Sequence, residues 1–413
     1  MSELKYWLWL SSLTGVRPRV KRLLLERYGG VREVYFAPRG DYAALGGLTE
    51  QECAALENKS FDTAYRIIED CENLGVDIRT IQDADYPRRL AAIYDPPVVL
   101  YVRGRLPVVD EKAAVAVVGT RRASPYGIKM AARLGYELTR CGGLVVSGLT
   151  VGVDVTAAQG ALMAGGSCIG VLGSPIDDES WGGETARDVA AAGAVISEYP
   201  PGAKRHPAFF RARNRITAGL CVAAVVVEAP KRSGALLFAD EALSQGKEVF
   251  AVPANADAEN AAGGLALIKE GAQPVTGGWD VLSGFAGRFK DLRDPGAARK
   301  LPADCERTLS AYAAENAPEP EEREDATPPL VQKDVDKPQG VEYIDLRKQL
   351  EGLTEAQLAI VTALERPSTH IDDVIDKTGL PAQEVLSELT MLQIAGLVSQ
   401  EPGKRFTLNI SQK

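Results

Sequence analysis

A short basic segment within an otherwise acidic chain is the first feature that could do chemistry. The segment from Lys204 to Leu220 reads KRHPAFFRARNRITAGL, and its first twelve residues hold five Lys or Arg, a histidine and the pair Phe209 and Phe210. The 413-residue chain as a whole carries a formal net charge of −9. Guanidinium groups pair with phosphate oxygens, and phenylalanine rings can stack on unpaired bases. We therefore predict that this segment meets a polyanion that carries bases.

The arginines of this segment alternate along the chain. If the segment is extended, Arg211, Arg213 and Arg215 can share one face, with Asn214 between them. The stretch from Tyr199 to Ala235 holds seven Lys or Arg and one acid, Glu228, so local partners for ion pairs are scarce. The scarcity favours a binding role for the cluster over surface ion pairs, although either phenylalanine alone could be a core residue.

Three other loops bring similar chemistry, each directly after a predicted strand. The strand at 113–119 runs into two arginines, the strand at 144–148 ends in Ser-Gly, and the strand at 221–229 leads to Lys-Arg-Ser-Gly. Backbone N–H groups at a helix start bind anions without a charged side chain. The residues offered in this way are Arg121, Arg122, Ser147, Gly148, Ser233 and Gly234. The alternatives are a solvated basic loop for the arginine pair and a helix N-cap for Asp154.

Motifs for several other chemistries are missing. Gly119 is followed by Thr-Arg-Arg, where a dinucleotide site needs further glycines, and no Gly-x-x-x-x-Gly-Lys phosphate loop occurs in the chain. The two histidines, His206 and His370, are too few for a histidine-ligated metal site or a histidine-based triad. We therefore predict no catalytic residues, no metal and no cofactor.

The elements that position these loops alternate between strand and helix. Apolar runs predict strands at 113–119, 144–148, 167–173, 194–199, 221–229 and 248–253. Helical stretches are expected between them at 125–141, 154–164, 185–192 and 234–245. Continuous Val- and Ile-rich runs indicate strands covered on both faces, and the alternation predicts an α/β fold, a Rossmann-like doubly wound parallel sheet. Ligands of such sheets bind beyond the carboxyl ends of the strands, where the four loops above lie.

Segments of different character flank this sheet. Residues 1–80 are expected to form a helical SAM-like or helix-hairpin-helix domain, a cap for packing or protein contact in preference to a phosphate contact. The sheet domain is expected at 81–289, and an acidic Pro-rich linker at 290–345. Residues 346–413 predict three helices and a two-stranded ribbon, a winged helix. Its recognition helix carries Glu384 and Glu388 without Lys or Arg, so we expect it to contact protein and not to read a DNA sequence.

Composition places the chain among folded cytoplasmic proteins. Hydrophobic residues make up 45% and charged residues 25%, and no apolar run is long enough to cross a membrane. The N-terminus lacks the basic start and cleavage site of a signal peptide. The six cysteines are scattered and have no C-x-x-C pair, which is typical of reduced, buried thiols.

Several long motifs in order resemble the DprA/Smf family of DNA-processing proteins. They include YPRRLAAIYDPPVVLYVRG, VAVVGTRRASPYG, VVSGLTVGVD, FFRARNRITAGL and VVEAPKRSGAL, and the match covers about Asp83 to Leu282. The resemblance implies an extended Rossmann-like domain that binds single-stranded DNA and forms a homodimer. It also implies protection of incoming DNA and its delivery to the recombinase RecA during natural transformation.

The family's phosphate-binding positions can be carried over by motif. They fall on Arg121, Arg122, Ser147, Gly148, Lys204, Arg213, Asn214, Arg215, Ser233 and Gly234. Two departures stand out: Gln159 replaces a frequent histidine, and Leu265 with Ala266 replaces a polar pair in the last loop. The second departure removes from that last loop the polar pair with which the resemblance would imply DNA contact.

Two alternatives belong to other functional classes. The sheet also resembles nucleoside-monophosphate phosphoribohydrolases of the LOG type, with Glu241 at a plausible distance from the loop. The stretch from Ala229 to Gly234, however, lacks that family's double glycine. The other alternative is a winged-helix transcription factor, which the acidic recognition helix disfavours. A single-strand DNA-binding protein is the favoured function.

Overall fold

The computed structural model describes residues 3–305, 307–308, 311, 354–364, 369–394, 398–401 and 405–408. The chain divides into two compact units, Met1–Glu322 and Arg323–Lys413, which we describe separately. The predicted linker at 290–345 lies largely outside the described residues. The domain boundaries at 80, 289 and 345 therefore remain predictions.

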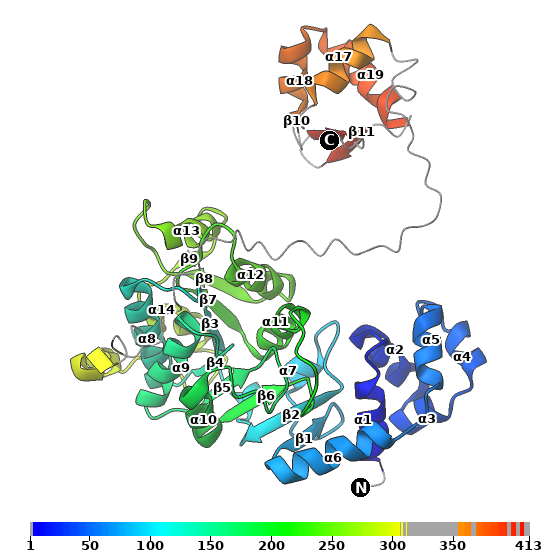
Figure 1. Cartoon of the computed structure of the whole chain (residues 1–413). Helices are drawn as coiled ribbons and strands as arrows, with labels where there is room; N and C mark the ends of the chain where they lie inside the picture. The colour runs from blue at the N-terminus through cyan, green and yellow to red at the C-terminus, as the bar shows by residue number, and fades with distance from the viewer. Residues whose placement is uncertain are drawn as a thin grey trace. The chain divides into compact units, whose positions relative to one another are not determined.

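The first unit is built around one sheet, which in the described residues has nine strands (Figure 1). The strands are β1 Asp77–Thr80, β2 Val99–Gly104, β3 Ala114–Val118, β4 Leu144–Ser147, β5 Cys168–Val171, β6 Ala194–Ser197, β7 Ala223–Val226, β8 Glu248–Ala251 and β9 Gln273–Pro274. Their order is β1-β2-β6-β5-β4-β3-β7-β8-β9. Strands β3 to β9 run parallel, while β1 and β2 pair antiparallel. The α/β prediction with a mainly parallel, doubly wound sheet is confirmed.

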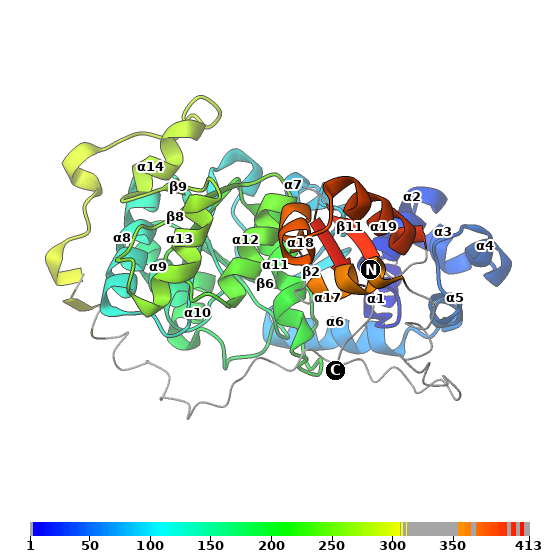
Figure 2. The same ribbon diagram turned by 90° about the horizontal axis from the view of Figure 1, so that it is seen from above.

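Helices cover both faces of this sheet, as the two views in Figures 1 and 2 show. The helices of the first unit are α1 Leu4–Ser12, α2 Pro18–Tyr28, α3 Val31–Phe36, α4 Arg39–Ala44, α5 Glu50–Glu57, α6 Asp62–Leu74, α7 Arg88–Ala91, α8 Pro125–Arg140, α9 Val153–Met163, α10 Gly183–Ala192, α11 Ala208–Leu220, α12 Gly234–Ser244, α13 Ala262–Lys269 and α14 Gly278–Leu282. Short 3₁₀ turns lie at Val109–Glu111, Glu259–Ala261, Ser283–Phe285 and Gly296–Arg299.

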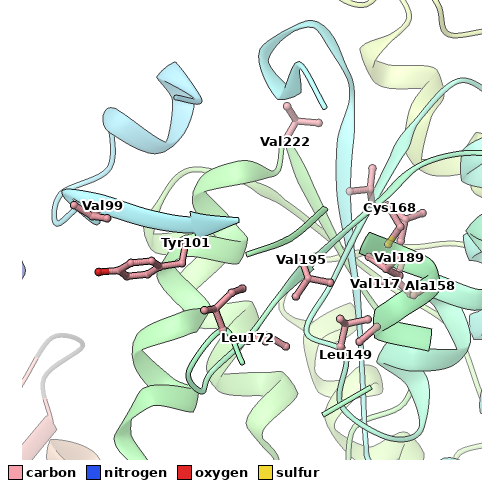
Figure 3. Close-up of a cluster of buried hydrophobic side chains, with 14 of the residues drawn as sticks. Val99, Tyr101, Val117, Leu149, Ala158, Cys168, Leu172, Val189, Val195 and Val222 are labelled. Atoms are coloured by element: carbon pink, nitrogen blue, oxygen red, sulfur yellow. The ribbon is translucent and has the colours of Figure 1, made fainter. Parts of the chain in front are cut away.

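Alternating residues of the central strands build two separate cores. In β3, Val115 and Val117 belong to the same core as residues of α8, α9 and α10, while Ala114 and Ala116 belong to the core that includes residues of α7, α11 and α12. Figure 3 shows part of the first core, including Val117 and Val195. Burial on both faces explains why these strands are continuous apolar runs instead of alternating ones.

The N-terminal helices pack against the antiparallel edge of the sheet. Trp7 and Leu10 of α1 belong to the same core as Val99 and Tyr101 of β2. Arg22 of α2 donates a 2.5 Å hydrogen bond to the carbonyl oxygen of Ile93. The predicted helical start of the chain is therefore present, and it shares a continuous core with the sheet.

The second unit has the predicted winged-helix elements. Its described helices and strands are α17 Glu355–Ala363, α18 Ile371–Thr378, α19 Ala382–Ile394, β10 Thr369–His370, β11 Val398–Glu401 and β12 Arg405–Leu408. The strands pair in the order β10-β12-β11. A small core that includes Ile360, Val374, Leu389 and Phe406 holds the helices on this ribbon.

The condition under which the arginines of the basic segment could share one face is not met. The basic segment is not extended: residues Ala208–Leu220 form α11, which ends where Cys221 turns extended. Its apolar face, including Ile216 and Leu220, packs into the second core. The helix begins at Ala208, directly after Pro207, and the alternating arginines of its second turn gave no apolar stripe at helical spacing.

Candidate nucleic-acid interface

The point where the strand order reverses lies at β3. This strand pairs with β4 on one side and β7 on the other, so the loops that leave β3, β4 and β7 share one edge of the sheet. The backbone N–H of Thr120 donates a 2.8 Å hydrogen bond to the carbonyl oxygen of Glu228, and Val153 N donates to Thr120 O at 3.3 Å. These bonds tie the three loops together into one rim, as the sheet topology requires.

An aromatic and cationic cluster lies on this rim. The guanidinium carbon of Arg121 is 5.4 Å from the ring centroid of Trp181 and 5.5 Å from that of Phe210. The two rings meet edge to face with their centroids 4.7 Å apart. Arg121 is exposed and both rings are half-buried. The cluster thus presents a positive charge beside aromatic surface, the combination that suits a phosphate next to an unpaired base.

Arg213 is close to the rim but is buried beneath it. It is 8% exposed, and its Nη1 donates a 2.8 Å hydrogen bond to the carbonyl oxygen of Val171. A side chain added at Gly148 would collide with the Arg213 guanidinium and with the Asp154 carboxylate, so these two groups enclose that glycine. Burial lowers the pKa of Arg213, and Asp154 opposes the shift. Burial likewise raises the pKa of Asp154, which Arg213 opposes.

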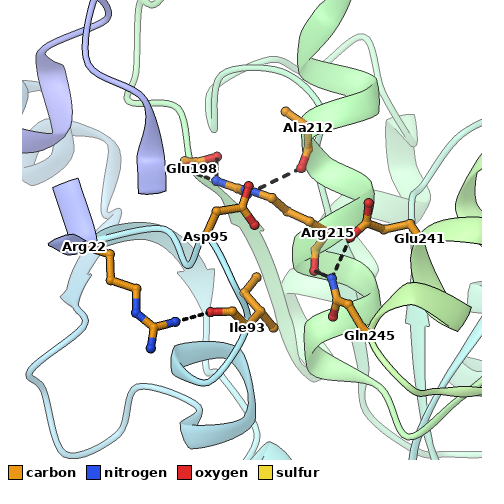
Figure 4. A network of polar contacts seen from close by, with 8 residues as sticks. All are labelled: Arg22, Ile93, Asp95, Glu198, Ala212, Arg215, Glu241 and Gln245. Carbon is orange, nitrogen blue, oxygen red and sulfur yellow. Dashed lines mark hydrogen bonds and ion pairs between the residues drawn. The ribbon is translucent and has the colours of Figure 1, made fainter. Parts of the chain in front are cut away.

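Arg215 does not lie on the rim. It is 5% exposed, and it pairs with Glu198 at 2.6 Å and with Asp95 at 3.1 Å (Figure 4). The backbone carbonyl of Arg215 also accepts a 3.1 Å bond from Gln245 Nε2. The argument from scarce acids failed because Asp95 is 120 residues away in sequence, and Glu198, 17 residues before Arg215, lies just outside the stretch from Tyr199 to Ala235. Arg215 has a structural partner set, and we no longer count it among the phosphate ligands.

The helical form of α11 also sets Arg213 apart from Arg211 and Arg215. Residues two apart on a helix lie about 200° apart around its axis, so Arg211, Arg213 and Arg215 cannot form one exposed row. Arg211 is exposed and the other two are buried. Asn214 between them is half-buried.

The start of this basic segment is more open. Lys204 is exposed, and Arg205 pairs with the buried Asp178 at 2.5 Å. Phe209 stacks on Tyr199 with ring centroids 3.6 Å apart and planes 11° apart. Phe209 thus already has a stacking partner within the protein, whereas Phe210 faces Trp181 and Arg121.

The two predicted helix starts differ in accessibility. Ser147 is fully buried: its Oγ donates to Asp154 O at 2.8 Å and accepts from Leu149 N at 3.0 Å. A side chain at Gly152, just before α9, would strike the carbonyl oxygens of Thr120 and Arg121, so the start of α9 is covered. The N-cap of α9 is Gly152, and Asp154 lies in the first turn of the helix. The expectation that Asp154 caps this helix is therefore wrong.

The start of α12 is open by comparison. Ser233 is its N-cap residue but makes no capping bond, and its buried Oγ has no partner in the described part of the chain. A Cβ built on the exposed Gly234 would meet nothing within 4 Å. Lys231 and Arg232 precede it and are exposed. Ser233 and Gly234 therefore stay in position for an anion, whereas Ser147 and Gly148 are enclosed by protein.

The positions that depart from the family pattern have definite surroundings. Gln159 Nε2 donates a 3.0 Å hydrogen bond to Thr185 Oγ1, inside the protein. Leu265 and Ala266 lie on α13, half-buried and exposed respectively. Glu241, the residue considered for hydrolase chemistry, is seven residues into α12 and thus about 10 Å along the axis from its start. Its Oε1 accepts from Gln245 at 2.8 Å, so no observation favours the hydrolase.

Sequence reasoning missed Trp181, the ring that completes the cluster. It lies in the loop between β5 and α10, which carries no basic motif. A signal was available in the sequence, because a tryptophan stands within the polar stretch DDESWGGE in the loop that follows a predicted strand. Among the described residues, no group of three or more His, Cys, Asp or Glu side chains is placed to hold a metal. No helix in the described ranges has the length and apolar character to cross a membrane.

Comparisons with known proteins agree with this arrangement. The family model described as DNA recombination-mediator protein A matches residues 77–286, and that of the DprA winged helix domain matches residues 346–404. Protein Smf of Synechocystis sp. is 31% identical over 98% of both chains. DNA processing protein DprA of Streptococcus pneumoniae is 39% identical over 50% of this chain and 73% of its own.

A solved structure gives the same result for the fold. The crystal structure of DprA from Streptococcus pneumoniae superimposes with a TM-score of 0.60 and 31% identity, over 68% of this chain and 97% of that chain. Two family models match the sheet domain and the winged helix, and one relative matches the chain over nearly its full length. The chain belongs to the DprA/Smf family of DNA-processing proteins.

Proposed function

We propose that this chain binds single-stranded DNA along the carboxyl edge of its sheet, protects it, and passes it to the recombinase RecA. The observation that carries the proposal is the placement of Arg121 over the rings of Trp181 and Phe210. A phosphate can pair with the outer side of the guanidinium while a neighbouring base stacks on the exposed part of a ring. A duplex hides its base faces and can use only the first of these contacts.

Other cations extend this surface in two directions along the rim. Arg122 follows Arg121 in the β3 loop, and Lys231 and Arg232 precede the open start of α12. Lys204 lies in the connection before α11. Exposed cations on adjacent loops can follow a flexible phosphate chain without contacts to base edges. The proposed binding is therefore electrostatic and stacking in character, with little dependence on sequence.

The family supports the biological part of the proposal. Relatives of this chain are named DNA processing proteins, and the matching family model is described as a recombination mediator. We propose that the protein works as a homodimer that delivers incoming DNA to RecA during natural transformation. Catalysis plays no part in this proposal, and a cytoplasmic location is expected for it.

A titration with a poly-dT oligonucleotide and its duplex with poly-dA, at several salt concentrations, tests the DNA proposal. Single strands should bind about tenfold or more tightly, because stacking adds roughly 1–3 kcal/mol per base. The logarithmic salt slope should be about −0.7 for each phosphate neutralised. Equal affinity for the two forms, or tighter binding of the duplex, would contradict the proposal.

The RecA and dimer parts need separate measurements. Sedimentation velocity at several protein concentrations should give the mass of two chains. The rate at which RecA assembles on a long single strand should rise when this protein is bound first. A monomer at micromolar concentration would contradict the homodimer, and an unchanged assembly rate would contradict delivery to RecA. Neither result would affect the proposal that the chain binds single-stranded DNA.

A further inference from the structure

A buried acid lies directly beneath the basic β3 loop. Glu228 follows β7 by two residues and is 4% exposed. Its Oε2 accepts a 2.9 Å hydrogen bond from the backbone N–H of Ser124, and its Oε1 accepts a 2.5 Å bond from the Ser124 hydroxyl. A carboxylate beneath a surface that we propose to bind phosphates calls for an explanation, because its charge opposes binding.

The same acid holds both ends of the loop. Besides the two bonds to Ser124, its backbone carbonyl accepts the 2.8 Å bond from Thr120 N. Arg121 and Arg122 thus lie between two residues that Glu228 fixes. The carboxylate also lies against the first turn of α8, where a side chain on Gly127 would collide with it. It therefore occupies the helix start that holds the pyrophosphate in dinucleotide-binding sheets.

Asn260 completes this support from the other side. Its Nδ2 donates a 2.9 Å hydrogen bond to the carbonyl oxygen of Arg122 and lies 3.4 Å from Glu228 Oε2. The backbone carbonyl oxygen of Asn260 accepts a 2.9 Å hydrogen bond from the backbone N–H of Ala229. The loop backbone is thus held at Thr120, Arg122 and Ser124, while the arginine side chains stay exposed.

We propose that Glu228 and Asn260 are positioning residues, which fix the β3 loop so that Arg121 and Arg122 meet the phosphates. This inference rests on the proposed function. It makes a prediction opposite in sign to simple electrostatics. Removing a negative charge from beneath a phosphate-binding loop should strengthen binding if charge alone matters, and weaken it if the acid positions the loop.

The experiment is a titration of the full chain with a dT oligonucleotide, using Glu228→Gln and a matched control. Gln keeps the size but turns one oxygen into an amide donor that faces the Ser124 donors. Glu248→Gln makes the same charge change at the first residue of β8, which lies at the amino ends of the parallel strands and not at the carboxyl ends where the β3 loop lies. E228Q should bind about fivefold or more weakly, within the range of coupling between contacting residues. E248Q should stay within about twofold of wild type.

A second background separates positioning from general damage to the fold. In a chain that already carries R121A and R122A, E228Q should cause no further loss, because the loop has nothing left to present. An equal fold-loss in both backgrounds would overturn the inference, as would unchanged or tighter binding by E228Q itself.

Asn260→Ala provides a second test of the inference, which applies even if E228Q does not fold. This change removes the bond to Arg122 and leaves the net charge unaltered, and it should weaken binding in the same loop-dependent way. Wild-type affinity of N260A would contradict the inference. Failure of the proposed function is distinguishable, because in that case the wild-type chain itself would not bind the oligonucleotide.

Discussion

Arg215 and Glu198 are joined by two hydrogen bonds from a single guanidinium nitrogen, at 2.6 and 2.8 Å. The arginine comes from α11 and the acid follows β6, so this pair fixes the basic helix onto the sheet. With Asp95 as a second acid, the guanidinium is satisfied inside the protein. A residue that the sequence suggests as a DNA ligand is thereby part of the support of the proposed DNA-binding surface.

Arg215→Ala should therefore reduce stability. Removing one partner of a buried ion pair leaves the other charge uncompensated, and the expected loss of unfolding free energy is about 3–5 kcal/mol. Urea unfolding followed by circular dichroism measures it. Arg211→Ala, an exposed arginine on the same helix, should change stability by less than about 0.5 kcal/mol. Similar unfolding midpoints for both variants would show that the pair contributes little.

Arg121→Ala should weaken single-strand binding without unfolding the protein. The side chain is exposed, and its loss removes one phosphate contact and the positive charge over two rings. We expect about a tenfold loss of affinity and a salt slope reduced by about 0.7. Fluorescence anisotropy with a labelled dT oligonucleotide measures both. Arg140→Ala, at the far end of α8, is the matched control and should bind as wild type does.

Trp181→Ala should narrow the preference for single strands over duplex. The ring offers stacking and not charge, so its loss should lower single-strand affinity by roughly 1–3 kcal/mol per stacked base and leave the salt slope unchanged. Competition between single and double strands gives the ratio directly. Tyr65→Ala removes an exposed ring on α6 and is the control, which should leave the ratio of single-strand to duplex affinity unchanged. An unchanged ratio would contradict a stacking role for Trp181.

Glu52 should make stability depend on acid pH. Hydrogen bonds from Arg17, at 2.8 Å to each carboxylate oxygen, lower the pKa of Glu52 from 4.5 to about 2. A lowered acid pKa means that the stabilisation is complete above about pH 4.5 and is lost as pH falls through 2. Glu52→Gln should cost about 1–3 kcal/mol at pH 7 and progressively less below pH 4. Unfolding curves from pH 2 to 7 test this, and a cost independent of pH would contradict it.

A chain that ends at Pro318 should bind single strands nearly as well as the whole protein. Helix α19 of the winged helix carries Glu384 and Glu388 and no Lys or Arg, which does not suit contact with phosphates. The same dT titration applies, with circular dichroism as a check on folding. A loss of more than about tenfold in a folded fragment would place part of the DNA site in the winged helix.

The sheet was the most predictable part of the molecule. A strand buried on both faces is a continuous apolar run, and runs such as AAVAVVG and CVAAVVVEA occur wherever the structure has a central parallel strand. The rim followed from this, because the carboxyl ends of parallel strands share one edge. Arg121, Phe210 and the start of α12 were found in this way.

Errors arose where long-range contacts decide the outcome. Whether Arg215 is free depends on Asp95, 120 residues away in sequence, and no local pattern encodes that pairing. Ser147 and Gly148 look like a phosphate loop, but their neighbours Asp154 and Arg213 fill the space above them. A linear reading can assign residues to the rim, yet it cannot tell which side of the rim each one faces.

Strand β1 has a consequence for how the chain can be divided. Its four residues, Asp77 to Thr80, pair with Val99 to Val102 and so cover the outer edge of β2. A fragment that began at residue 81 would leave the backbone donors and acceptors of that apolar strand unpaired. Unprotected edges of this kind join with strands of other molecules, so such a fragment would be prone to aggregate. Strand β1 therefore protects this edge of the sheet from pairing with other molecules, and a fragment meant to stay soluble has to retain it.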